Sequence, residues 1–162
     1  MKHLVWGVAI CLISIPVLHG QQTPPTLGPS QPSLEGPTSS HTADRRLLLN
    51  MRKIYIQRID HDLNETLSDD LAHVSWIKVV DKPDEADAIV RGTCFGLRRL
   101  KRLHAEVYIN DRVTGKSIWQ DVIRVPYDPP ALPKAVDNAA AEILAHLNQS
   151  IRAAANPQRG RY

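Results

Sequence analysis

Residues 103–125 limit the fold most, because their apolar and polar residues alternate on both sides of a short turn. The apolar residues of the first half share one side, and they are Leu103, Ala105, Val107 and Ile109. Residues 111–115 follow as a hairpin loop in which Gly115 supplies a left-handed position, and residues 116–125 return as a second strand. A two-residue period fits a half-buried strand. The stretch therefore predicts an antiparallel hairpin with one buried face.

Three shorter stretches before this hairpin predict further strands. Residues 52–59 alternate, residues 76–80 are rich in β-branched side chains, and residues 87–97 form a longer apolar stretch. Gly92 and Gly96 interrupt the last of these, and glycine inside a strand indicates a bulge.

Two stretches have helical spacing. Asp62 and Glu65 form a capping-box pattern at the start of a helix expected over residues 63–73. A longer apolar stripe begins at Pro133 and ends at the Asn-Pro pair 156–157. The stripe residues expected in the core are Leu67, Leu71, Ile143 and Leu147. The element order is β-α-β-β-β-β-α. It predicts an α+β fold with two helices packed on one face of a mainly antiparallel sheet.

The first twenty residues have the layout of a secretory signal peptide. A short basic start precedes a mostly apolar stretch, residues 4–18, and Gly20 supplies a small residue at the cleavage point. About 15 apolar residues are too few for a membrane span, which needs roughly 20. We therefore expect no membrane span after cleavage of residues 1–20, with an uncleaved anchor as the alternative. No Cys follows Gly20, so we expect an exported protein, periplasmic or secreted, and not a lipoprotein.

Residues 21–43 hold five Pro, eight Ser or Thr, and no Lys or Arg. Such a composition cannot bury enough apolar surface to offset the entropy of ordering, so it predicts a disordered linker. The remaining chain then forms a single α+β domain over residues 44–156 and a flexible tail over residues 157–162.

Charge and motifs exclude several classes of function. The chain carries 20 Lys and Arg against 17 Asp and Glu, and a net charge of +3 is too small to indicate nucleic acid as a partner. No HExxH, Cys-x-x-Cys or phosphate-binding glycine loop occurs, so we expect no cofactor and assign no catalytic or metal residue. Cys94 is the single Cys after the signal, and its apolar surroundings predict a buried thiol, with a bridge between two copies as the alternative.

Two sets of residues keep an enzymatic alternative open, a small secreted hydrolase or thiol enzyme. Residues 60–62 offer three metal ligands in a row, although adjacent residues rarely converge on one ion. Cys94 and His104 would pair across a hairpin as a thiol dyad, without the local motif of a known protease family.

The candidate contact residues lie at one hairpin end and on one sheet face. The basic cluster consists of Arg98, Arg99, Lys101 and Arg102. It fits a solvated end that protects a sheet edge, or a contact with an anionic polymer or lipopolysaccharide. No aromatic residues alternate with these charges, which disfavours single-stranded nucleic acid. Tyr55 and Tyr108 point to the polar sides of their strands, so on an open sheet face they would contact a partner.

Two sequence stretches carry a resemblance to known proteins. Residues 85–92 read EADAIVRG, and residues 107–119 read VYINDRVTGKSIW. Together they resemble the small exported α/β domains of bacterial envelope proteins, which include the curli-assembly lipoprotein CsgG, the amino-terminal domain of TolB and LpoB-like activators of penicillin-binding proteins. The resemblance covers residues 52–155. It implies a non-enzymatic accessory or adaptor domain of the cell envelope that binds a protein partner.

Overall fold

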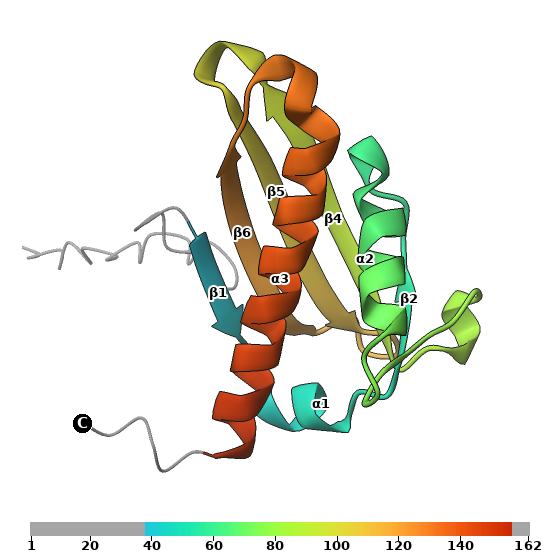
Figure 1. The fold of residues 1–162 in the computed structure, drawn as a ribbon. Helices are drawn as coiled ribbons and strands as arrows, with labels where there is room; N and C mark the ends of the chain where they lie inside the picture. Colours follow the sequence, from blue (N-terminus) through green and yellow to red (C-terminus); the bar gives the residue numbers. More distant parts are fainter. Residues whose placement is uncertain (1–37, 157–162) are drawn as a thin grey trace, which may run out of the picture. The chain divides into compact units, whose positions relative to one another are not determined.

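The computed structural model describes residues 38–156, which form one sheet with helices packed against it (Figure 1). The strands are β1 (Thr38–Thr42), β2 (Lys53–Ile56), β3 (Lys78–Val79), β4 (Ala88–Leu97), β5 (Arg102–Asp111) and β6 (Ser117–Pro126). The helices are α1 (Arg45–Asn50), α2 (Leu63–Ala72) and α3 (Leu132–Ala155). The expected signal peptide 1–20, most of the expected linker and the tail 157–162 lie outside the described residues.

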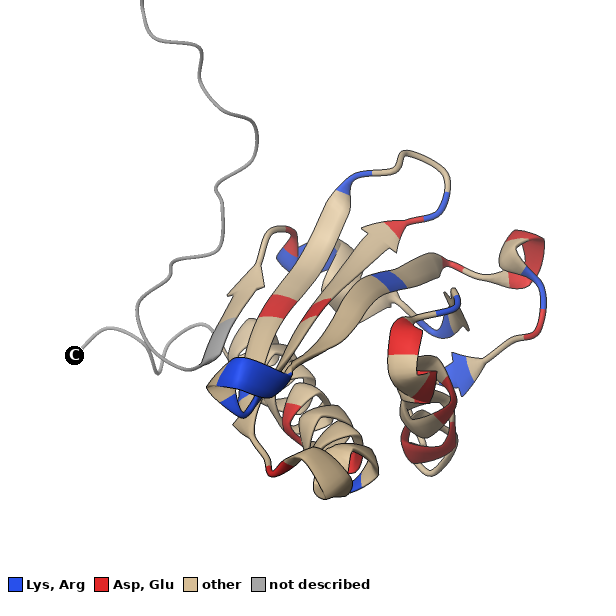
Figure 2. Cartoon of the chain, turned by 90° about the horizontal axis from the view of Figure 1, so that it is seen from above, with Lys and Arg blue, Asp and Glu red and all other residues tan. Residues whose placement is uncertain are grey.

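The six strands form a mixed sheet in the order β1-β6-β5-β4-β2-β3. Strands β4, β5, β6 and β1 pair antiparallel, whereas β2 pairs parallel with both β4 and β3. Helices α2 and α3 lie side by side on the same face of the sheet (Figures 1 and 2). The predicted α+β class, with two helices on one face of a mainly antiparallel sheet, is confirmed.

The amino-terminal boundary of the domain differs from the prediction. Residues Thr38–Thr42 form strand β1 and pair with β6, and the Ala43 N–H donates to the Ile118 carbonyl at 2.9 Å. The predicted disordered linker 21–43 is therefore wrong for residues 38–43, which belong to the domain. Ser and Thr are acceptable on an edge strand, so a polar composition did not reveal one.

The two short helices begin differently. Asp44 caps α1, because its Oδ1 accepts hydrogen bonds from the N–H groups of Arg46 and Leu47 at 2.9 and 3.0 Å. The capping box expected at Asp62 and Glu65 is absent. Asp62 has a left-handed backbone (φ 59°), and its side chain makes no capping hydrogen bond. The chain enters α2 through this single turn, and Asp is among the few residues that tolerate the left-handed region.

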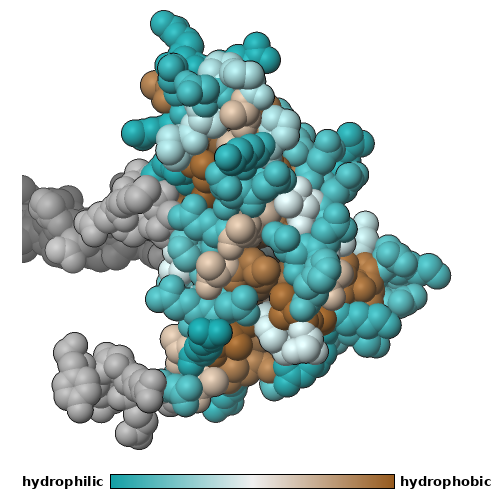
Figure 3. Space-filling view, viewed as in Figure 1, coloured by the Kyte–Doolittle hydropathy of each residue, from teal (hydrophilic) through white to brown (hydrophobic). Residues whose placement is uncertain are grey.

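The hydrophobic core lies between the sheet and the helices. The four stripe residues Leu67, Leu71, Ile143 and Leu147 are all buried, as predicted. Trp119 of β6 is also fully buried, and it packs with the inward residues of β5. The outer surfaces of α2 and α3 are mostly hydrophilic (Figure 3). The helices therefore bury one stripe each and leave the other side in water.

The glycines of β4 do not mark bulges, contrary to the prediction. The register between β4 and β5 runs without interruption from Ala88 to Leu97, and the irregularity lies between Ile109 and Asn110, where β5 pairs with β6. A Cβ at Gly92 would overlap the backbone carbonyl oxygen of Glu106. Glycine is needed here because two backbones approach closely.

Substituting each glycine by Ala tests this explanation. Gly92→Ala should lower the free energy of unfolding by about 2–3 kcal/mol, because backbone atoms must move to admit the methyl group. At Gly96 the added Cβ meets the Tyr127 hydroxyl at 2.6 Å, which is the end of a side chain. Gly96→Ala should therefore cost clearly less, about 1 kcal/mol. Urea unfolding of both variants measures the difference, and equal losses would contradict the proposed cause.

The docking of α3 predicts a second stability difference. Leu147→Ala should lower the free energy of unfolding by about 2–5 kcal/mol, since it leaves a cavity between α3 and the sheet. Leu100→Ala is the matched control, because Leu100 is exposed and should change stability by less than about 0.5 kcal/mol. Thermal and urea unfolding measure both, and similar small losses in the two variants would show that α3 does not dock as described.

Candidate functional site

One face of the sheet carries no helix among residues 38–156 (Figure 2). The alternation along the three central strands places a row of polar and aromatic side chains on that face. We call these residues the open face, and they are Arg91, Thr93, Phe95, His104, Glu106, Tyr108, Gln120 and Arg124. Ile89, Leu97 and Val122 share this side of the sheet, and Val122 is buried, so the open face is polar and aromatic around some apolar positions.

The centre of the open face is held by a hydrogen-bonded row on β5. The His104 Nε2 lies 2.8 Å from Glu106 Oε1, and the Tyr108 hydroxyl donates to Glu106 Oε2 at 2.9 Å. The Phe95 ring of β4 packs on the His104 ring, with 4.8 Å between the ring centroids. Glu106 therefore fixes the side chains on both sides of it, and the surface is ordered before any partner binds.

These contacts determine the charge of the row. The hydrogen bond from His104 is the largest cause that lowers the pKa of Glu106, and the Tyr108 hydroxyl and the charge of Arg124 lower it further against the opposing effect of burial. Burial, and then the hydrogen bond to Glu106, raise the pKa of Tyr108. At neutral pH the row therefore presents a carboxylate between two donors, with a phenol at one end.

The two tyrosines predicted as contact residues lie on this same side of the sheet. Tyr108 is opposite Arg91 of β4, and Tyr55 on β2 is opposite Ile89 of the same strand. Both tyrosines are half-buried. Tyr55 therefore extends the face by one strand beyond β4.

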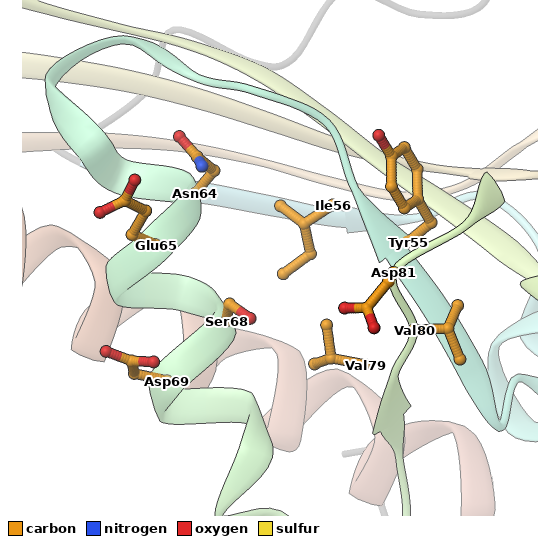
Figure 4. A pocket seen from close by; sticks show the side chains of 9 residues that line it. All are labelled: Tyr55, Ile56, Asn64, Glu65, Ser68, Asp69, Val79, Val80 and Asp81. Atoms are coloured by element: carbon orange, nitrogen blue, oxygen red, sulfur yellow. The ribbon is translucent and has the colours of Figure 1, made fainter.

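Behind β2 lies a pocket of about 470 Å³ between α2 and the sheet edge (Figure 4). Ile56 points toward α2 and Tyr55 points away from it (Figure 4). The pocket is lined by Tyr55, Ile56, Asn64, Glu65, Ser68, Asp69, Val79, Val80 and Asp81. Its three carboxylates and apolar floor would suit a basic side chain, but nothing else in the described residues points to a ligand.

The basic cluster forms the end of the β4–β5 hairpin (Figure 2). A 3₁₀ turn, η3 (Arg98–Leu100), is closed by Lys101 in a left-handed conformation with φ 49°. The Lys101 Nζ lies 3.0 Å from Asp128 Oδ1, and all four basic residues are exposed. The structure brings the cluster together at one end of β4, whereas Tyr55 pairs near the other end of that strand.

The structure assembles neither the thiol dyad of Cys94 and His104 nor a metal site at residues 60–62. Cys94 is buried on the inner face, opposite Ala105, whereas His104 lies on the open face, so the two side chains point to opposite sides of the sheet. Burial, with the charge of Asp60, raises the pKa of Cys94 to about 11, which disfavours the reactive thiolate. Within residues 38–156, no group of three or more His, Cys, Asp or Glu side chains is arranged to hold a metal ion.

Sequence reasoning missed a polar contact between β6 and α3. The His146 Nδ1 lies 2.7 Å from Asp121 Oδ2, and the Asp121 side chain is fully buried. Burial is the main cause that raises the pKa of Asp121, and the hydrogen bond from His146 opposes it. The available signal was an acidic residue at an inward position of a strand, between Trp119 and Ile123. The contact joins helix to sheet and is inside the fold, apart from the open face.

Within the described part of the chain, no helix has both the length and the apolar character needed to cross a membrane. No protein-family model matches the sequence, and no curated protein matches it.

The chain superposes on several solved structures. A point variant of the PelC dodecamer from Paraburkholderia phytofirmans superposes with a TM-score of 0.50 at 10% identity, over 69% of this chain and 98% of that chain. The PelC dodecamer of the same organism in another crystal form gives 0.49 at 11% identity, over 68% and 96%. A PDZ domain protein from Parabacteroides distasonis gives 0.46 at 12% identity, over 78% and 36%. At these identities the likeness to the PelC variant shows a similar fold alone. The resemblance to the CsgG, TolB and LpoB-like group stays a prediction.

The row on β5 predicts a pH dependence of stability. Because the folded state lowers the pKa of Glu106, the ionised carboxylate contributes stability that is complete above its unfolded pKa of about 4.3 and is lost as the pH falls through the lower folded value. The stability difference between wild type and Glu106→Gln should therefore be largest above about pH 5 and shrink below about pH 4.

Gln149→Ala is the control for this experiment, because Gln149 is exposed on α3 and carries no titratable group. Its stability difference from wild type should stay flat over the same range. Unfolding by urea at a series of pH values measures both variants, and parallel curves for the two would remove the role assigned to Glu106.

Proposed function

We propose that this protein is a non-enzymatic binding module of the bacterial cell envelope whose open face binds a protein partner. The observation that carries the proposal is the hydrogen-bonded row His104, Glu106 and Tyr108, which is partly exposed on a sheet face without a covering helix among residues 38–156. Protein interfaces are enriched in aromatic residues and Arg, and ordered side chains lose little entropy on binding. The open face offers Phe95, Tyr108 and two arginines in one patch.

The amino-terminal sequence supports an envelope location. Residues 1–20 have the features of a signal peptide, which fits export to the envelope. An accessory role is also what the resemblance of residues 52–155 to small envelope domains implies.

The chemical environment of Cys94 supports the proposal of a non-enzymatic role. Cys94 is buried with a raised pKa, and no histidine shares its side of the sheet at the paired position, where Ala105 stands. The polar row of the open face has a donor–acceptor pattern and contains no Ser or Cys. Its chemistry fits recognition better than bond cleavage.

Site-specific cross-linking tests the proposal in the host cell. A photo-cross-linking amino acid in place of Thr93, an exposed open-face residue opposite Glu106, should give a covalent adduct with one partner. The same amino acid in place of Gln149, exposed on α3 in the helix layer, should give none. Adding Tyr108→Ala to the Thr93 variant should lower the adduct yield at least ten-fold, because aromatic residues at the centre of an interface contribute about 2 kcal/mol or more.

The mass of the adduct identifies the partner class. PelC is a dodecamer in the crystals described above, so an adduct with the mass of two copies would indicate that this protein also self-associates through the open face. Adducts at position 149 and none at position 93 would contradict the proposed face. An unchanged adduct yield in the Tyr108→Ala variant would show that the adduct does not come from specific binding at the open face.

A further inference from the structure

The end of the β4–β5 hairpin exposes apolar side chains in an unusual concentration. Residues 38–156 contain four large hydrophobic residues that are exposed, and Leu97 (38%), Leu100 (65%) and Phe95 (43%) lie at or beside this end. The fourth, Val113 (77%), lies on the β5–β6 loop at the opposite end of β5. In Figure 3 a small hydrophobic group projects at the upper left among hydrophilic side chains. Soluble proteins scatter such residues singly, so a local group needs an explanation.

Positive charge surrounds this apolar group. We call residues 97–102 the hairpin tip, which contains four basic residues and no acidic one. Within the described residues the side chains of Arg98, Arg99 and Arg102 make no hydrogen bond or ion pair. Lys101 alone is paired, with Asp128. Three guanidinium groups are thus left for an external anion.

The backbone of the hairpin tip is fixed. The Lys101 N–H donates to the Arg98 carbonyl at 3.3 Å, and the Lys101 carbonyl accepts a hydrogen bond from the N–H of Tyr127 at 2.9 Å. The Tyr127 side chain is buried in the core. The tip is therefore a projecting turn attached to the end of β6, and Leu100 is presented at its end without further folding.

We propose that the hairpin tip docks on the surface of an anionic lipid bilayer, with Leu97 and Leu100 inserted at the level of the headgroups and the arginines paired with lipid phosphates. Long basic side chains with apolar neighbours are the composition that binds membrane interfaces. A soluble polyanion would explain the charges but not the exposed leucines. Three guanidinium groups around two exposed leucines on a projecting turn match the anionic headgroups and the apolar layer below them, and a protein partner is the alternative outcome of the test. This surface is distinct from the centre of the open face, and the proposal does not depend on the proposed partner.

Fluorescence of a single site tests the docking with the full chain. An environment-sensitive fluorescent amino acid is placed genetically at position 100 or, as the matched control, at position 113, where the original Val is also exposed. Vesicles contain either phosphatidylcholine alone or a mixture with about one-third phosphatidylglycerol. Emission at position 100 should shift to the blue with the anionic vesicles only, and emission at position 113 should not change. A label at one site reports on that site whatever residues 1–20 contribute to binding.

Two variants distinguish the contribution of charge to vesicle binding from that of apolar insertion. In the position-100 protein, Arg98→Gln with Arg99→Gln should weaken binding to anionic vesicles about 30-fold, since each basic residue near such a surface contributes about five-fold. In the position-100 protein, Leu97→Ser should weaken binding about ten-fold by removing apolar contact. Binding should also fall with added salt.

Several results would overturn the proposal. They are no shift at position 100, equal shifts at both positions, and equal shifts on neutral and anionic vesicles. Inorganic polyphosphate that binds as tightly as the vesicles, with no loss in the Leu97→Ser variant, would assign the tip to soluble polyanions. A shift with a vesicle-free extract of envelope proteins, and none with lipid, would assign it to a protein.

Discussion

The packing of α3 on β5 and β6 is the interaction on which the rest of the structure depends. Ala139 and Ala140 are fully buried, and their small side chains let the helix approach the sheet, where Leu147 fills the space beyond them. Two polar contacts fix the carboxyl-terminal half of the helix, from His146 to Asp121 and from the Trp119 indole N–H to Ser150 Oγ at 2.9 Å. Because the helices cover one face only, every alternate residue of the central strands remains on the other. The candidate site is a direct consequence of this one-sided packing.

The sequence predicted those parts of the fold that depend on periodicity. Alternation located the strands of the central hairpin, and it placed Tyr108 on the side opposite Val107 before any register was known. The two helices were found in the same way, since each has one continuous apolar stripe. Whether Cys94 and His104 share a face of the sheet could not be decided without the register of β4 against β5. Only the register, in which Cys94 lies opposite Ala105, shows that the two point to different faces.

Features that depend on tertiary contact could not be predicted from local pattern. Strand β1 was missed because its order comes from β6 rather than from its own Ser- and Thr-rich sequence. Asp62 fits a capping pattern, yet the turn before α2 gives it a left-handed backbone and its side chain does not cap the helix. Gly92 indicated a bulge, whereas the glycine accommodates the neighbouring strand. Only part of the row on β5 was predicted. Tyr108 was identified as a contact residue, whereas no motif pointed to its hydrogen-bonded neighbour Glu106.

The pairing of β1 with β6 has a consequence for the order of folding. Thr42 is opposite Trp119, so the first strand of the described chain can pair only after most of the domain has been synthesised. Contacts so distant in sequence form late, because the entropy of closing a long loop must be met before they stabilise anything. The antiparallel unit β4–β5–β6 can assemble first from neighbouring segments. The outer edge of β6 then stays open until the amino-terminal segment returns to it, and during that interval it is the part of the sheet most exposed to pairing with another chain.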